Sequence, residues 1–234
     1  MEKKILLFVV LVFILVIGLF FVKDQKPVLE NLPRNETQIH QVKFYDKKTF
    51  IEGIEKSKET TKPAYLIRGG IVPHHLFPGF ITADFFKRLS YQNPKIIILI
   101  GPNHYEKGNF KALTSLYNWD TSYGLVNPDS DLINKLLSRN LVEIGEEVLP
   151  GDHAVSGVIP FVKYFLKKEK VVPILLKRGF SEKESEILSL DLSEVIDEDT
   201  IIVAAVDFSH YLTAEQAEEI DKVTQKIMED FDYS

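Results

Sequence analysis

The 234-residue sequence contains no cysteine. This absence excludes a disulfide framework, a thiolate nucleophile and every cysteine-based zinc or iron–sulfur site. The sequence also lacks an excess of basic residues, because 28 Lys and Arg are outnumbered by 34 Asp and Glu and the two signs are interleaved. A nucleic-acid surface needs a basic patch, so we exclude nucleic acid as a partner.

Three motifs of common active sites are missing as well. The chain has no HExxH metal motif, no GxSxG nucleophile elbow and no GxxxxGK[ST] phosphate loop. The sequence therefore gives no sign of a zincin protease, a serine hydrolase of the α/β class or a P-loop nucleotide site.

A long apolar run is present near the N-terminus. Residues 5–22, ILLFVVLVFILVIGLFFV, carry no charge, and as a helix they would span about 27 Å, close to the thickness of a bilayer core. The run is longer than a signal-peptide core, and no Ala-x-Ala-like site follows it, so we predict an uncleaved anchor rather than a cleaved signal peptide. The expected location is the membrane, with a single pass and a C-terminal domain outside the cytoplasm.

The rest of the chain divides by composition. We predict a transmembrane anchor over residues 1–24, a polar tether over 25–62 and a folded domain over 63–234. In that domain, runs of Ile and Val alternate with amphipathic stretches such as HAVSGVIPFVKYFLKKEK, residues 153–170, which we expect to form one helix. Strands that are apolar throughout are typical of a sheet buried on both faces. The pattern predicts an α/β fold, a layered sandwich with a mostly parallel central sheet flanked by helices.

Histidines follow the ends of three of the predicted strands. His74 and His75 follow IRGGIV, His104 follows KIIILIGPN, and Asp207 and His210 follow TIIVAAV, while His153 opens a predicted helix beside Asp152. Ligands of open parallel sheets bind outside the carboxyl ends of the strands, so we expect these side chains to converge in one pocket. Neighbouring residues of an extended chain face opposite sides, so we expect His75 to point away from the pocket that His74 enters.

Imidazole is a common ligand for iron, copper and zinc. With Asp207 available, the set fits either a site of two histidines and one oxygen ligand, or a metal site with a separate histidine base. The spacing matches no motif that would identify the metal.

Four motifs in order, over roughly residues 64–215, resemble the Memo family, called AmmeMemoRadiSam system protein B in prokaryotes. The family's Pro-His is matched at 73–74, its Gly-Pro-[Ser/Asn]-His at 101–104, its acidic-His helix start by DHAVSGVIPF, and its Ser-Ser-Asp-Phe-[Ser/Cys]-His by AVDFSH. The family's fold resembles that of class III extradiol dioxygenases.

This resemblance implies roles for the matched residues. His74 and His104 would be metal ligands, with iron preferred and copper or zinc as alternatives. Asp207 and His210 would be catalytic residues, His210 as the base, and His153 and Asn103 would line the pocket.

Two departures from the family pattern bear on catalysis. Ala154 and Ser156 stand where the family has serine and glutamate. The family also continues into a segment that supplies a cysteine beside the metal. Either this chain is part of a longer protein that has that segment, or the third ligand is Asp207 or a solvent molecule.

The resemblance therefore implies a membrane-anchored domain with a histidine metal pocket and non-haem iron chemistry of the dioxygenase kind, acting on a small molecule. The alternatives are a non-catalytic module that binds a metal, a ligand or a protein partner, and a zinc hydrolase.

Overall fold

The computed structural model describes residues 38–57 and 61–230. The strands are β1 (Ile39–Gln41), β2 (Gly69–Val72), β3 (Ile96–Pro102), β4 (Ala112–Thr114), β5 (Asn118–Thr121), β6 (Gly124–Pro128), β7 (Glu143–Ile144), β8 (Lys170–Leu176) and β9 (Thr200–Ala205). The helices are α2 (Lys47–Lys56), α3 (Gly79–Leu89), α4 (Ser130–Ser138), α5 (His153–Ser156), α6 (Ile159–Phe165), α7 (Glu182–Val195) and α8 (Ala214–Asp230), with a 3-10 turn at Leu149–Gly151.

The strands form one sheet in the order β1-β5-β6-β8-β3-β9-β2, with β4 pairing β8 and β7 pairing β4. Only the β5–β6 and β4–β8 pairs are antiparallel among the described strands. The predicted α/β fold with a mostly parallel central sheet is therefore confirmed. Strands β2, β3 and β9 lie side by side and parallel, so their carboxyl ends meet at one edge.

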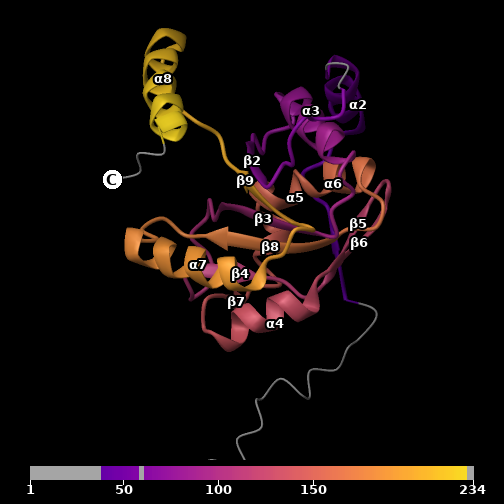
Figure 1. The fold of residues 1–234 in the computed structure, drawn as a ribbon, viewed down its shortest axis with the longest axis vertical. Coiled ribbons are helices and arrows are strands. Elements are labelled where there is room, and N and C mark those ends of the chain that lie inside the picture. Colours follow the sequence, from indigo (N-terminus) through magenta and orange to yellow (C-terminus); the bar gives the residue numbers. More distant parts are fainter. Residues whose placement is uncertain (1–37, 58–60, 231–234) are drawn as a thin grey trace, which may run out of the picture. The chain divides into compact units, whose positions relative to one another are not determined.

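Helices cover both faces of the sheet, as Figure 1 shows, with α2, α3, α5 and α6 on one side and α4 and α7 on the other. The burial of β3 on both faces explains why its sequence is apolar throughout. Ile97 and Leu99 belong to the core under the first group of helices, whereas Ile98 belongs to the core under the second. Side chains that alternate between two buried faces leave no position for a polar residue.

The prediction of a single-pass membrane protein is corrected by the structure. Within residues 38–57 and 61–230, no helix has the length and apolar character needed to cross a membrane. The anchor predicted at residues 5–22 lies outside the described residues.

Part of the segment predicted as a polar tether contributes to the folded unit, which begins at Ile39. Strand β1 pairs in parallel with β5, and Phe50 of α2 is fully buried in the larger core. Asp46 caps the N-terminus of α2, and its side chain accepts a hydrogen bond from the Thr49 amide. The segment is polar on average because only one face of α2 is buried.

The single helix predicted over residues 153–170 is two short helices in the structure. Helix α5 ends at Ser156 and α6 begins at Ile159, and strand β8 already begins at Lys170. Gly157 between the helices and Pro160 in the first turn of α6 account for the break, because neither residue favours the interior of a helix.

Candidate metal site

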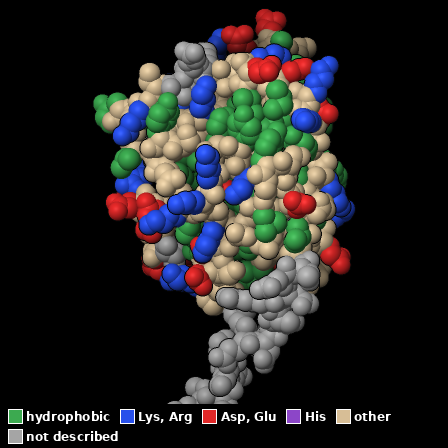
Figure 2. All heavy atoms as spheres, turned by 90° about the vertical axis from the view of Figure 1, so that its right-hand side faces the viewer, with side chains coloured by type: hydrophobic (Ala, Val, Ile, Leu, Met, Phe, Trp, Pro, Cys, Tyr) green, Lys and Arg blue, Asp and Glu red, His purple; other side chains and the backbone are tan. Residues whose placement is uncertain are grey.

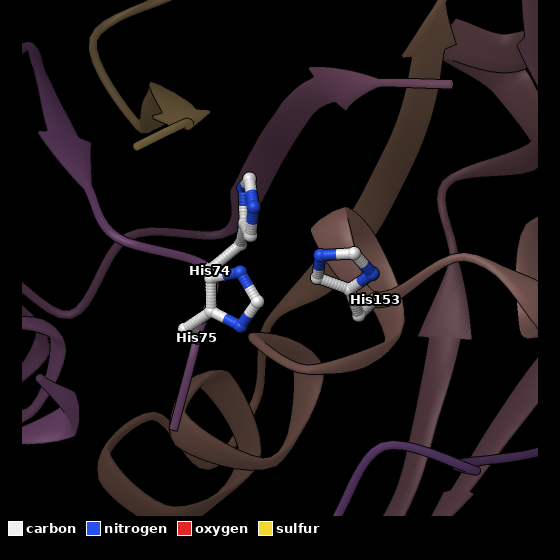
Figure 3. A group of neighbouring side chains, drawn as sticks. All are labelled: His74, His75 and His153. Atoms are coloured by element: carbon white, nitrogen blue, oxygen red, sulfur yellow. The ribbon is translucent and has the colours of Figure 1, made fainter. Parts of the chain in front are cut away.

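The strand-end histidines gather at the edge formed by β2, β3 and β9. The ring centroids of His74 and His104 are 4.9 Å apart, and those of His74 and His153 are 4.7 Å apart. Figure 3 shows His74 and His75, from the loop after β2, together with His153 from the start of α5. No described histidine is visible on the face shown in Figure 2, so the cluster does not open on that face.

His74 is held with one ring nitrogen available for a ligand. Its Nδ1 lies 3.0 Å from the carbonyl oxygen of Ala205, and because a carbonyl only accepts, Nδ1 carries the proton. The lone pair is then on Nε2, a buried atom with no hydrogen-bond partner among the described residues. Burial lowers the pKa of His74, so the ring stays neutral, as a metal ligand must be.

His104 is oriented by a buried carboxylate. Its Nδ1 lies 2.8 Å from Oδ1 of Asp152, and its backbone amide donates to Oδ2 of the same side chain at 2.7 Å. Asp152 is fully buried and also caps α5, accepting from the Ala154 amide at 3.0 Å. A carboxylate on Nδ1 leaves the Nε2 lone pair of His104 for a metal, the arrangement that metal-binding histidines usually have.

His153 stacks on His104 with ring centroids 4.0 Å apart and contacts Phe44 on another side. Its Nε2 is buried without a hydrogen-bond partner among the described residues. Burial, followed by the neighbouring rings of His104 and His74, lowers its pKa from 6.5 to about 4. The His153 ring is therefore neutral at physiological pH and has a nitrogen lone pair available to bind a metal.

Asp207 lies among three imidazoles. Its Oδ2 is 3.5 Å from Nε2 of His74, 3.3 Å from Nε2 of His75 and 3.5 Å from Nε2 of His210. Its Oδ1 accepts from the His74 amide at 3.3 Å. The predicted catalytic pair, Asp207 and His210, is thus placed beside the predicted ligand His74, and His210 is the more exposed of the two.

Two glycines allow the segments that carry the site to approach closely. A Cβ on Gly157 would lie 2.8 Å from the carbonyl oxygens of both His74 and His153. A Cβ on Gly101, in β3, would lie 2.7 Å from the Cβ of Ala154 in α5. Both contacts are too short for any larger residue, so these positions set the spacing between the histidine-bearing segments.

The donor atoms form two possible metal sets among the described residues. One is His74, His75 and His153, and the other is His104, Asp152 and His153, with the ligand atoms of each set within 4.8 Å of one another. The donors are nitrogens and a carboxylate, which suits iron, copper or zinc. His74 and His104, the predicted ligands, fall in different sets that share His153.

The prediction that His75 points away from the pocket is wrong. Its ring centroid lies 4.8 Å from that of His153 and 5.0 Å from that of His74. Alternation between faces holds only in an extended strand, and β2 ends at Val72, before both histidines. The bend that follows turns both rings to the same side.

Asn103, predicted to line the pocket, is buried and closes the turn after β3. Its Nδ2 donates to the carbonyl oxygen of Lys107 at 2.8 Å, and its Oδ1 accepts from the Lys107 amide at 3.2 Å. These bonds fix the loop that begins with His104.

Comparison with known proteins gave one family. The model of the family described as "Memo-like protein" matches residues 42–234. A MEMO1 family protein of Aquifex aeolicus (strain VF5) is 31% identical over 177 residues, which cover 74% of this chain and 63% of the relative. A MEMO1 family protein of Nitrosopumilus maritimus (strain SCM1) is 31% identical over 149 residues, 62% of this chain and 54% of the relative. The chain thus spans between about half and two thirds of the length of these relatives.

Proposed function

The chain belongs to the Memo-like protein family, and from this premise we propose that it binds a divalent metal ion through His74 and His104, with iron as the expected metal and copper or zinc as alternatives. The main support is that Nε2 of His74 and Nε2 of His153 are buried without hydrogen-bond partners among the described residues. A buried polar atom without a partner is costly, and a metal ion would supply the missing interaction.

We further propose non-haem iron chemistry of the dioxygenase kind on a small oxygenated aromatic substrate. Iron, when bound, would supply open coordination positions and the capacity for redox chemistry. Nε2 of His210 faces Oδ2 of Asp207 at 3.5 Å, so Nδ1 of the same ring would accept the substrate proton, and the Asp207 carboxylate would stabilise the resulting imidazolium. Asp152 would keep Nε2 of His104 unprotonated throughout.

One observation favours a non-catalytic metal-binding module instead. The family resemblance implies a glutamate at position 156, and this chain has Ser156 there, which removes a carboxylate from the helix that carries His153. In that case the ion would be held by His74, His104 and a third donor such as His153 or Asp207.

The test is anaerobic titration of the full chain with Fe(II), Cu(II) and Zn(II), in parallel with a His74→Ala variant. We expect His74→Ala to weaken the binding of the preferred metal by more than about 100-fold, beyond the effect of changing a residue that only supports a ligand. The matched control is His40→Gln, since His40 is a buried histidine bonded to Ser115 and Glu146 and lies in β1. Equal affinity of His74→Ala and the unaltered protein for all three metals would refute the metal site.

The iron-loaded protein then distinguishes the enzyme from the module. Oxygen consumption that depends on added catechol and is lost in His210→Ala would support dioxygenase chemistry. Stoichiometric iron without oxygen consumption would support the binding module.

A further inference from the structure

A cleft of about 380 Å³ lies apart from the histidine cluster. Its walls come from the loop after β3, the loop after α4, the loop after β8 and helix α7, and none of the site histidines lines it. The lining residues are Asn109, Phe110, Lys111, Asn140, Leu141, Phe180, Glu184, Ile187 and Leu188. The volume falls within the range of roughly 300–1,000 Å³ that small-molecule sites occupy.

The walls of the cleft are mainly apolar. Two aromatic rings, Phe110 and Phe180, and three aliphatic side chains supply most of its surface. Ile187 is 43% exposed and Phe110 is 36% exposed, so the cleft presents apolar surface to water. Covering such surface with an apolar ligand is favourable because it releases the water in contact with it.

The charged groups of the cleft neutralise one another. Nζ of Lys111 lies 2.8 Å from a carboxylate oxygen of Glu184 and also donates to the carbonyl oxygen of Gly179. A charged ligand would have to break this pair to gain a partner. The side-chain amides of Asn109 and Asn140 each offer a donor and an acceptor without adding charge.

We propose that this cleft is a second ligand site, for a neutral aromatic small molecule that carries one hydrogen-bonding group. The rings of Phe110 and Phe180 would contact its apolar body, and the amides of Asn109 and Asn140 would bond its polar group. The site does not depend on the metal proposal, because the two share no residue.

The test uses two fluorescent probes with the same aromatic skeleton. N-phenyl-1-naphthylamine is neutral with one N–H donor, and 8-anilino-1-naphthalenesulfonate adds a negative charge. Added to the full chain, the neutral probe should bind saturably with one site per chain, and at least tenfold more tightly than the sulfonate. Ile187→Trp, which fills the cleft, should weaken the neutral probe at least tenfold. Leu190→Trp is the matched control, since Leu190 is on the same helix, is 67% exposed and does not line the cleft.

Three results would overturn the proposal. Equal binding of the neutral probe by Ile187→Trp and Leu190→Trp would place the probe elsewhere. Equal binding of both probes would remove the argument from charge. The third result combines two measurements: the neutral probe does not bind, and sedimentation shows that the unaltered protein is a dimer whereas Ile187→Trp is a monomer. This result would mean that a second copy of the chain covers the cleft. Thermal unfolding of both variants confirms that they are folded.

Discussion

The substitution Asp152→Asn tests whether the Asp152 carboxylate orients His104 to bind a metal. In the native protein Oδ1 accepts from Nδ1 of His104 and from the Ala154 amide, while Oδ2 accepts from the His104 amide. Asparagine keeps the shape but replaces one oxygen by an NH₂ group, which can only donate.

Either orientation of the new amide breaks one hydrogen bond to the backbone. With NH₂ at the Oδ2 position, it faces the amide N–H of His104, and that donor loses its partner. With NH₂ at the Oδ1 position, the Ala154 amide loses its partner, and Nδ1 of His104 must become an acceptor, which moves the ring proton to Nε2. A buried donor left without a partner costs about 1–3 kcal/mol, so the free energy of unfolding should fall by that amount in both cases.

The effect on metal binding follows from the same geometry. Both orientations remove the negative charge that strengthens His104 as a metal ligand. With NH₂ at the Oδ1 position, the proton also moves to Nε2, the nitrogen that would bind the metal. Loss of a group that supports a ligand in this way typically weakens metal affinity by about 10–100-fold. Denaturant unfolding of the metal-free protein and calorimetric titration with Zn(II) measure the two effects separately.

Asp129→Asn is the matched control for this experiment. Asp129 is also a buried helix cap, accepting from the Leu132 amide at 2.9 Å, but its other partner is Lys170 and not a histidine. It should lose stability and keep its metal affinity. If Asp152→Asn binds Zn(II) as tightly as Asp129→Asn does, Asp152 caps α5 without orienting a metal ligand.

Three further outcomes are expected. The pKa of His153 is lowered from 6.5 to about 4, so the contribution of the neutral ring to stability is fully present above pH 6.5 and is lost as the pH falls toward 4. The denaturant midpoint of the metal-free protein should therefore fall across this pH range, and it should fall less steeply in His153→Phe than in the unaltered protein. Both carboxylate oxygens of Glu169 are buried without hydrogen-bond partners among the described residues, Lys163 is 3.6 Å away, and burial raises the pKa of Glu169. Glu169→Gln removes this buried charge and should raise the melting temperature at pH 7 by roughly 2–4 °C. A lower melting temperature would show that the ion pair stabilises the fold. Gly157→Ala should weaken Zn(II) binding by separating the His74 and His153 segments, while Gly151→Ala, whose Cβ meets nothing within 4 Å, should not.

The sheet could be predicted because β3 is apolar throughout and β8 and β9 are apolar after their first residues, Lys170 and Thr200. Each strand is flanked on both faces by helices, so the pattern arises from the burial itself and can be read locally. The hairpin of β5 and β6 could not be predicted in this way. Trp119 of β5 is fully buried, but Asp120 beside it is exposed and Asn118 is half-buried, and the sequence around it resembles a loop.

His40 is a second buried residue that the local sequence did not identify. Its surroundings in sequence are polar, and we expected it in a tether, yet it is buried and bonded to Ser115 and Glu146, residues 75 and 106 positions away. No local pattern can report partners at such separations. The same reasoning explains why β1 and α2 were not recognised as parts of the domain.

The types of side chain at the candidate site could be predicted, but their orientation could not. Strand ends in a parallel sheet meet at one edge whatever the intervening sequence, so His74 and His104 were expected at the same edge. That the two rings are neighbours depends also on the strand order, in which only β9 separates β3 from β2. Which nitrogen of each ring is available depends instead on Ala205 and Asp152, which lie 131 and 48 positions from their respective partners. A motif therefore identifies imidazoles near one another, whereas the carbonyl and the carboxylate behind them determine whether the lone pairs face a common point. A substitution at Asp152, outside the ligand set predicted from the sequence, therefore tests whether His104 is oriented for a metal, which a substitution of His104 itself does not test.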